Sequence, residues 1–246
     1  MNNLWKYIII ATAIVLSAVV LATAYTERYR MQSGTITVTG LGETEFTSDL
    51  IIVNGSLNVE RYDVADGYRQ MEQDREKVIK FLKNHGISEE CISFAMLSHR
   101  ETYSSVYQEG KYIGETFDGY YLSQEFTIES KDIDAVEEVA RELPSLLAED
   151  INISVYEPMY FYSDLNTLKL DLIAAAAADA RDRATQIAMN SNAKLGNLNW
   201  SYAGVFQITA ATGDEEFSAG GAFNLSSREK KARVTVRSEF KIKTVK

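Results

Sequence analysis

The sequence predicts an α+β fold: an antiparallel sheet with helices on one face, in which a ferredoxin-like βαββαβ core is joined by a long third helix and C-terminal strands. Three observations predict it. Several short segments alternate apolar and polar residues, as half-buried strands do. Two segments between them repeat apolar residues at helical spacing. A long alanine-rich segment, typical of a helix, then precedes a regularly alternating C-terminal one.

The first two predicted strands lie on either side of a glycine pair. Residues 35–39 alternate, and we expect Gly40-Leu41-Gly42-Glu43 to end this strand as a turn. Residues 50–60 form a clearer strand, because apolar side chains occupy alternate positions along it. Gly55, in the middle of that strand, indicates a bulge or a closely packed neighbour.

The first core helix follows these strands. Asp63 or Asp66 is the expected N-cap, because a carboxylate there accepts hydrogen bonds from the first backbone N–H groups. Gly86 is the expected terminator, and His85 places a cation at the negative end of the helix dipole. The apolar face of this helix is predicted to contain Val64, Tyr68, Met71, Val78 and Leu82.

A long hairpin and a second helix complete the core. We expect a strand from Ile92 to about Tyr103 and a returning strand over residues 121–129, with turns at Glu109-Gly110 and Asp118-Gly119. The next predicted elements are a helix over 131–150, kinked or restarted at Pro144, and a strand over 151–161. Residues 50–161 thus read β-α-β-β-α-β, the split βαβ order that places both helices on one sheet face.

The remaining residues predict one more helix and two strands. Ser163 or Asp164 starts the helix, and its run of alanines at 174–178 permits another element to approach closely. Asp179 and Arg183 form an i,i+4 pair that we expect at the surface. A strand is predicted over 199–211, residues 212–227 have loop composition, and the last strand alternates from Ala232 to Lys243.

The N-terminal segment predicts either export of the chain across a membrane or its anchoring in one. The run from Tyr7 to Tyr25 contains no charge, and as a helix it would extend roughly 28 Å, close to the hydrocarbon thickness of a bilayer. Ala22-Thr23-Ala24 also fits a signal-peptide cleavage site. A cleaved signal peptide and an uncleaved anchor both remain open, and both place everything after Tyr25 outside the cytoplasm. The predicted divisions are residues 1–25 as signal peptide or anchor, 26–33 as juxtamembrane spacer, and 34–246 as one α+β domain.

Composition excludes several functional classes. The net charge of −10 over 246 residues argues against a nucleic-acid partner. One cysteine can form neither an internal disulfide nor a CxxC pair. Walker, HExxH and G-x-S-x-G sequences do not occur, and Gly40-Leu41-Gly42 lacks the third glycine of a dinucleotide fingerprint. We therefore predict no catalytic residues, no cofactor and no metal, and the sequence names no ligand.

The few reactive side chains each have a simpler structural interpretation. His85 is a helix-end cation, and His99 lies on a predicted strand face that we expect to be exposed. Cys91 is a small apolar residue at the start of a strand. Asp214-Glu215-Glu216 belongs to a solvated loop, because calcium needs six to eight oxygens from a shaped loop.

Five tyrosines on the predicted hairpin form the candidate interaction surface. Tyrosines there are either ordinary sheet stabilisers or a docking surface, since tyrosine gives a large contact area at low entropic cost. The hairpin is longer than the predicted core can cover, so we expect a homo-oligomer to which it contributes contacts. The five residues are Tyr103, Tyr107, Tyr112, Tyr120 and Tyr121.

Three segments together resemble a known family. Residues 35–43 (TITVTGLGE) are similar to its strand and Gly-x-Gly-Glu turn, and Ala177-Ala178-Asp179-Ala180-Arg181 to its Ala-Asp-Ala-Arg helix. Lys194-Leu195-Gly196 matches the Leu-Gly step before the next strand. From about Gly34 to Lys243 the chain therefore resembles SIMPL-domain proteins, bacterial envelope proteins that include periplasmic immunogenic and oxidative-stress-defence proteins.

The resemblance implies an α+β fold, export, and self-association, because some members form ring-like oligomers. It implies no catalytic residues, since the activity of the family is not established. The loop before the last strand departs from the pattern, being acidic and rich in glycine and alanine rather than proline and methionine. The favoured function is a non-enzymatic structural or interaction protein linked to envelope or oxidative stress. The alternatives are a periplasmic small-molecule or signal-binding module and, third, an enzyme without a recognisable motif.

A reporter fused after Lys246 tests the predicted address. We expect activity from a reporter that requires an extracytoplasmic location, because the uncharged run at residues 7–25 exports or anchors the chain. Activity of a reporter that works only in the cytoplasm would show that the body is not exported.

Overall fold

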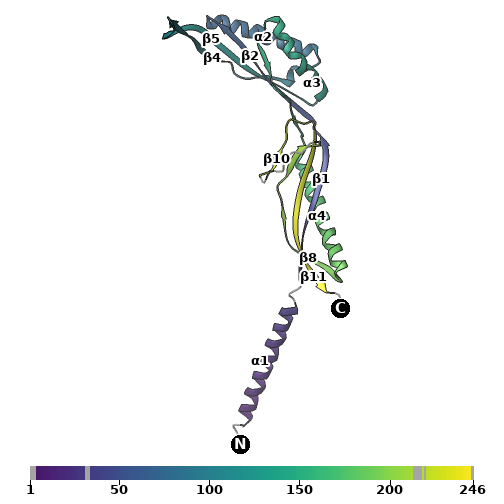
Figure 1. Ribbon diagram of the computed structural model, residues 1–246. Coiled ribbons are helices and arrows are strands. Elements are labelled where there is room, and N and C mark those ends of the chain that lie inside the picture. Colours follow the sequence, from purple (N-terminus) through teal and green to yellow (C-terminus); the bar gives the residue numbers. More distant parts are fainter. Residues whose placement is uncertain (1–3, 31–33, 213–217, 219, 245–246) are drawn as a thin grey trace. The chain divides into compact units, whose positions relative to one another are not determined.

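The computed structural model describes residues 4–30, 34–212, 218 and 220–244 (Figure 1). It has the predicted α+β class, with two sheets built mainly of antiparallel pairs. The elements, in chain order, are α1 (Leu4–Arg30), β1 (Thr35–Thr47), β2 (Leu50–Arg61), α2 (Val64–Asn84), η1 (Glu89–Cys91), β3 (Ile92–Phe94), β4 (Ser98–Gln108), β5 (Lys111–Ser130), α3 (Ile133–Glu142), η2 (Leu143–Glu149), β6 (Ile153–Val155), β7 (Met159–Phe161), α4 (Leu165–Asn190), β8 (Ala193–Ala203), β9 (Gln207–Ala210), β10 (Ala222–Phe223) and β11 (Glu229–Thr244).

The chain divides into two compact units, which we describe separately. The first unit comprises Met1–Glu43, Leu170–Phe206 and Arg233–Lys246. The second unit comprises Thr44–Lys169 and Gln207–Ala232.

The second unit contains the predicted βαββαβ arrangement. Its sheet has the order β3-β5-β2-β6, with β4 also pairing with β5 and β7 with β2, and all of these pairs are antiparallel. Both α2 and α3 pack on β2, so they cover the same face of the sheet, as predicted. The core between them includes Val53, Leu57, Val78, Leu82, Leu122, Phe126, Val136 and Val139.

Two predicted strands of this unit are each split into two. The strand predicted over 92–103 breaks between β3 and β4, where the buried Gln124 side chain donates a hydrogen bond of 2.9 Å to the Ala95 carbonyl. The strand predicted over 151–161 breaks between β6 and β7 at a segment that contains Pro158. Proline has no N–H to donate to a sheet and is therefore confined to strand ends and interruptions.

The predicted ends of α2 are confirmed, and so is the predicted interruption of the second helix at Pro144. The Asp63 carboxylate accepts hydrogen bonds from the N–H groups of Ala65 and Asp66, at 2.9 and 3.1 Å. Gly86 follows α2 with φ of +84°, a conformation that glycine adopts without strain. At the other helix, α3 ends at Glu142 and a 3₁₀ helix carrying Pro144 in its first turn follows.

The predicted buried face of α2 is wrong in its first turns. Tyr68 and Val64 are exposed, whereas Gly67 and Asp74 are buried beside Met71. A Cβ atom at Gly67 would lie 2.6 Å from a methyl group of Leu122. Because glycine has no side chain, the helix can lie close to the sheet at this point. A search for apolar residues alone misses both of these positions.

The first unit depends on close contact between α4 and β1. Contrary to the prediction, the Gly40-Leu41-Gly42-Glu43 segment does not end the strand, and β1 runs without a break to Thr47. A Cβ atom at Gly40 would lie 2.1 Å from the Ala176 carbonyl oxygen, and one at Gly42 would lie 2.2 Å from that of Leu172. The facing side of α4 is fully buried and consists of Ala176, Ala180, Ala184 and Ala188.

A polar contact accompanies this packing. The Leu41 N–H donates a hydrogen bond of 2.8 Å to the Asp179 carboxylate, which also accepts one from the Arg183 guanidinium. The pKa of the Asp179 carboxyl lies below its usual value, chiefly because of the hydrogen bond from Leu41. Asp179 is therefore more than one half of the surface ion pair that we predicted.

The C-terminal strands differ from the prediction in their boundaries. The strand predicted over 199–211 is two strands, β8 and β9, which separate at Gly204, whose N–H donates to the Thr235 carbonyl at 2.8 Å. Strand β11 alternates as predicted, and its side chains at Ala232, Val234, Val236 and Phe240 are buried. The predicted loop over 212–227 contains the short β10, while Asp214-Glu215-Glu216 lies outside the described residues.

Gly40→Ala is expected to destabilise the protein. The added methyl group overlaps backbone atoms of α4, and overpacking of this kind costs roughly 1–3 kcal/mol, more than the ~0.5–1 kcal/mol gained by replacing a strand glycine. We expect the melting temperature to fall by roughly 4–8 °C for a loss of about 2 kcal/mol. Gly220→Ala is the control, because the nearest atom to its added Cβ is 3.8 Å away. Equal melting temperatures for the two variants would contradict the close approach of α4.

Candidate interaction surface

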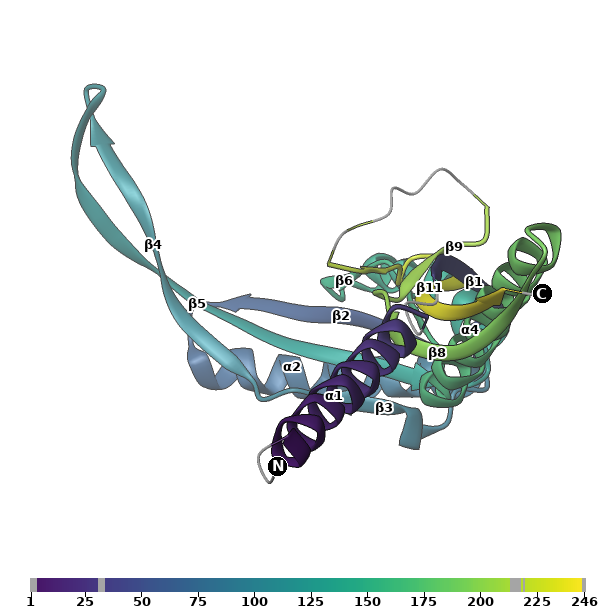
Figure 2. The ribbon, with the colours of Figure 1, turned by 90° about the horizontal axis from the view of Figure 1, so that it is seen from below.

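The hairpin of β4 and β5 extends beyond the rest of its sheet. The two strands pair from Ser98–Ser123 to Gln108–Lys111, but β2 pairs with β5 only as far as Arg61–Tyr120. Residues 102–119, which we term the arm, therefore form a two-stranded ribbon that twists away from the end of β2 (Figure 2).

One of the two turns predicted on the hairpin is confirmed. Glu109 and Gly110 have φ values of +52° and +76°, as a two-residue type I′ turn requires, and form the tip of the arm. Asp118-Gly119 is not a turn: it lies within β5, where Asp118 is the extra residue of a bulge between the Thr102–Gly119 and Tyr103–Phe117 pairs. Gly119 fits there because a Cβ atom would lie 2.7 Å from the Arg61 carbonyl oxygen.

Four of the five predicted tyrosines gather on one face of the hairpin. The Phe117 ring makes edge contacts with Tyr103 and Tyr120, at centroid distances of 5.9 and 5.3 Å. Tyr107 and Tyr112 face each other near the tip at 5.8 Å. Tyr103 and Tyr107 are four residues apart on β4, so they point to the same side.

Tyr62, just beyond the end of β2, extends this face. Its ring lies 5.3 Å from that of Phe117. We term the whole set the aromatic stripe: Tyr62, Tyr103, Tyr107, Tyr112, Phe117 and Tyr120.

Tyr121 is not brought together with the other four. Consecutive strand residues point to opposite faces, so Tyr121 lies on the side away from Tyr120. Its hydroxyl donates a hydrogen bond of 2.6 Å to Asn58, and the Arg100 guanidinium lies 4.7 Å from its ring centre. These contacts join β2, β4 and β5, which is the role of a sheet stabiliser.

The aromatic stripe is mostly open to solvent. The exposed fractions are 72% for Tyr62, 54% for Tyr103, 65% for Tyr107 and 52% for Tyr112. The Tyr103 hydroxyl donates to the Glu101 carboxylate at 2.5 Å, and this hydrogen bond raises the pKa of the tyrosine. The stripe therefore combines apolar ring surfaces with hydroxyl groups, the composition found at protein interfaces.

The two histidines and the cysteine considered as reactive groups make contacts with neighbouring side chains of the fold. His85 caps the end of α2 and contacts Glu142 of α3, with 2.9 Å between Nε2 and the carboxylate oxygen. His99 lies 6.4 Å from the ring of Tyr120, and Cys91 is half-buried against the core. Within residues 4–30, 34–212, 218 and 220–244, no group of three or more metal-binding side chains occurs.

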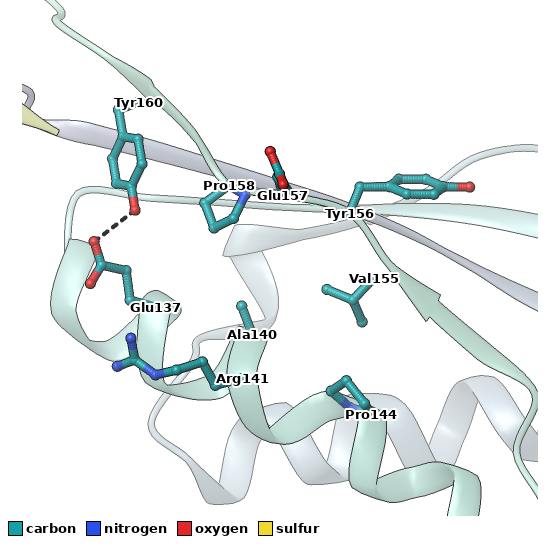
Figure 3. A pocket seen from close by; sticks show the side chains of 9 residues that line it. All are labelled: Glu137, Ala140, Arg141, Pro144, Val155, Tyr156, Glu157, Pro158 and Tyr160. Atoms are coloured by element: carbon teal, nitrogen blue, oxygen red, sulfur yellow. Dashed lines mark hydrogen bonds between the residues drawn. The ribbon is translucent and has the colours of Figure 1, made fainter. Parts of the chain in front are cut away.

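A pocket of about 360 Å³ lies between α3 and the segment that joins β6 to β7 (Figure 3). Both prolines of the chain, Pro144 and Pro158, line it from opposite sides. At one end Tyr160 and Glu137 point toward each other, and the Tyr160 hydroxyl donates a hydrogen bond of 2.8 Å to the carboxylate. Sequence reasoning missed this pocket, and the two prolines were the available signal.

The environment of Tyr160 favours the protonated form of its hydroxyl group. Burial, followed by the hydrogen bond to Glu137 and the charge of that carboxylate, raises the pKa of Tyr160 to about 12. The folded state thus binds this proton more tightly than the unfolded chain, whose tyrosine has its ordinary pKa of 10.0. The resulting contribution to stability is complete below about pH 10 and disappears as the pH rises toward 12.

The Glu137→Gln variant tests this arrangement. Removing the carboxylate charge should lower the pKa of Tyr160 toward, but not to, its ordinary value, because burial remains. Ultraviolet titration of the phenol groups measures it, and Tyr160→Phe identifies the step that belongs to this residue. Circular dichroism at each pH checks that the protein stays folded. An unchanged Tyr160 step in Glu137→Gln would contradict the hydrogen bond.

The N-terminal helix has the properties expected from the sequence. Tyr7–Tyr25 of α1 has a mean hydropathy of 2.4, and none of this stretch is buried. Among the described helices it alone is long and apolar enough to cross a membrane. A signal sequence shares these properties, so the two interpretations of the segment stay open.

Comparison with known families matches most of the chain. The family described as SIMPL, a protein of unknown function (DUF541), matches residues 36–240. No curated protein matches the chain. The match covers β1 from its second residue, the βαββαβ arrangement, α4 and β11 as far as Phe240. The chain therefore belongs to the SIMPL family.

Proposed function

We propose that this chain is a non-enzymatic assembly protein of the bacterial cell envelope, in which copies of the chain associate through the aromatic stripe. The observation that carries the proposal is the arm itself. Its strands pair only with each other, while more than half of each of three tyrosine side chains on one face is exposed.

The energetics of a two-stranded ribbon support this role. A ribbon of two strands is marginally stable in water on its own, and a third strand or a packed face stabilises it. Each aromatic side chain buried at a contact removes roughly 150–250 Å² from water. Tyr103, Tyr107 and Tyr112 supply such area with uncharged side chains, and the Glu101 carboxylate that accepts the Tyr103 hydroxyl lies beside them as a polar group of the same face.

A second copy of this chain is the proposed occupant of the stripe. An uncleaved α1 would hold the copies in one membrane plane, which raises the effective concentration of each arm for its neighbours. The tip residues Tyr107 and Tyr112 are exposed and, among the aromatic rings of the described residues, contact only each other, so their outer surface is available to a neighbouring copy.

The envelope address is the second part of the proposal. The apolar α1 supports export with either a cleaved signal or an inner-membrane anchor, and the net charge of −10 suits a body that is weakly repelled by anionic lipid. A role in envelope or oxidative stress is proposed from the family resemblance.

A non-enzymatic role agrees with where the reactive groups lie. His85 is engaged with Glu142, Cys91 is half-buried against the core, and His99 lies on β4 at the aromatic stripe. These three positions do not form a nucleophile and base pair of the kind that acyl transfer needs.

Replacing two tyrosines at the arm tip tests the assembly. We expect full-length protein in neutral detergent to be oligomeric by light scattering at micromolar concentration. Tyr107→Asp and Tyr112→Asp should each weaken association at least tenfold. Truncating an aromatic residue at a hot spot costs about 2 kcal/mol of binding free energy, and burying the new carboxylate in the contact adds to that cost.

Tyr156→Asp is the matched control for these variants. Tyr156 is 53% exposed and belongs to the β6–β7 segment, so the same chemical change is made away from the arm. A wild-type chain that remains monomeric would refute the assembly. An oligomer that tolerates both arm variants would retain assembly and exclude the stripe from it.

A further inference from the structure

A polar cavity of about 340 Å³ lies in the second unit, where α2 passes the end of β2. Asp74 of α2, Arg61 of β2 and Asp150 before β6 contribute to its lining. Its volume falls within the range of small-ligand sites, roughly 300–1,000 Å³. The aromatic stripe does not contribute to it, so it is a separate feature of the unit.

Asp74 is the unusual residue of this cavity. Only 2% of its surface is exposed, and one carboxylate oxygen accepts a hydrogen bond of 2.9 Å from the Gln70 side-chain amide. The other carboxylate oxygen accepts no hydrogen bond from the described part of the chain, and it is not sealed from solvent, because Ser48 Oγ is the one fully buried side-chain atom without a partner among the described residues. Since Asp74 lines the cavity, this oxygen opens into it, where a positive charge or an N–H group could bind it.

The one cationic residue of the lining, Arg61, is hydrogen-bonded to the side-chain amide of Gln70 rather than to Asp74. One guanidinium nitrogen of Arg61 donates to the Gln70 side-chain oxygen at 3.3 Å, and the other donates to the Glu60 carbonyl at 2.8 Å. Gln70 is therefore oriented with its oxygen toward Arg61 and its nitrogen toward Asp74. This orientation leaves the second Asp74 oxygen facing a cavity rather than a protein cation.

The charges of the lining favour a cationic occupant. The carboxylates of Glu60, Asp74 and Asp150 outnumber the single guanidinium of Arg61. A hard metal ion needs several oxygen ligands at once, and among the described residues the carboxylates do not form a group that could supply them. A primary ammonium group needs only one good carboxylate acceptor for its strongest hydrogen bond.

We propose that this cavity binds a small organic cation whose primary ammonium group donates to the free carboxylate oxygen of Asp74. The remaining ammonium hydrogens are directed to neutral acceptors of the lining, and Arg61 stays bound to Gln70. This inference goes beyond the proposed assembly function and does not depend on it, since the cavity and the aromatic stripe share no residue.

The experiment is calorimetric titration of the full-length protein in neutral detergent with 1,5-diaminopentane. The neutral isostere 1,5-pentanediol and calcium chloride are titrated in parallel. Binding of the diamine, with the diol at least tenfold weaker, is the expected result. Absence of diamine binding at millimolar concentration, equal binding of the diol, or binding of calcium in place of the diamine would each overturn the proposal.

Two isosteric variants locate the site. Asp74→Asn should weaken diamine binding at least tenfold, whereas Glu60→Gln makes the same change at an exposed lining residue and should weaken it less than threefold. Thermal denaturation checks the folding of both. Equal affinities in Asp74→Asn and the wild type would refute the assignment, and the diamine–diol comparison on the wild type decides the question if Asp74→Asn does not fold.

Discussion

The packing of the first unit depends on direct contact between the backbones of α4 and β1. Gly40 and Gly42 have no Cβ where the carbonyl oxygens of α4 arrive, and the facing positions of the helix are alanines. Small side chains on both elements bring the Leu41 N–H within 2.8 Å of Asp179. Larger residues at either surface would separate the elements and remove both the packing and the hydrogen bond.

Local sequence patterns predicted the elements better than the contacts between them. Alternation identified β2 and β11, and the Glu109-Gly110 turn was recognised because glycine and a polar residue accept positive φ. The glycines of β1 were misread as a turn, because a glycine serves equally in a turn or at a close approach. Only the position of α4, which lies far along the chain, distinguishes these two uses.

In the candidate site, too, local patterns predict which residues are present but not which of them come into contact. The tyrosines were visible in the sequence, but grouping Tyr121 with the other four overlooked the strand alternation that places Tyr120 and Tyr121 on opposite faces. The bulge at Asp118, which fixes how Tyr103 meets Phe117, depends on the register between two strands and has no local signature. Asp74 was missed for a different reason: a carboxylate on a helix is ordinarily solvated, and its burial follows from the packing of α2 beside Gly67 and Met71.

The bulges of the arm also constrain how its length can drift in evolution. Strand β5 carries one unmatched residue at Asp118 and another at Ile113, between the Val106–Gly114 and Tyr107–Tyr112 pairs. Because side chains alternate along a strand, a single residue inserted between these points would place Tyr112 on the face opposite Tyr107, unless a further bulge absorbed it. Length changes that preserve the aromatic stripe therefore come as pairs of residues or as a bulge that leaves the pairing on either side unchanged.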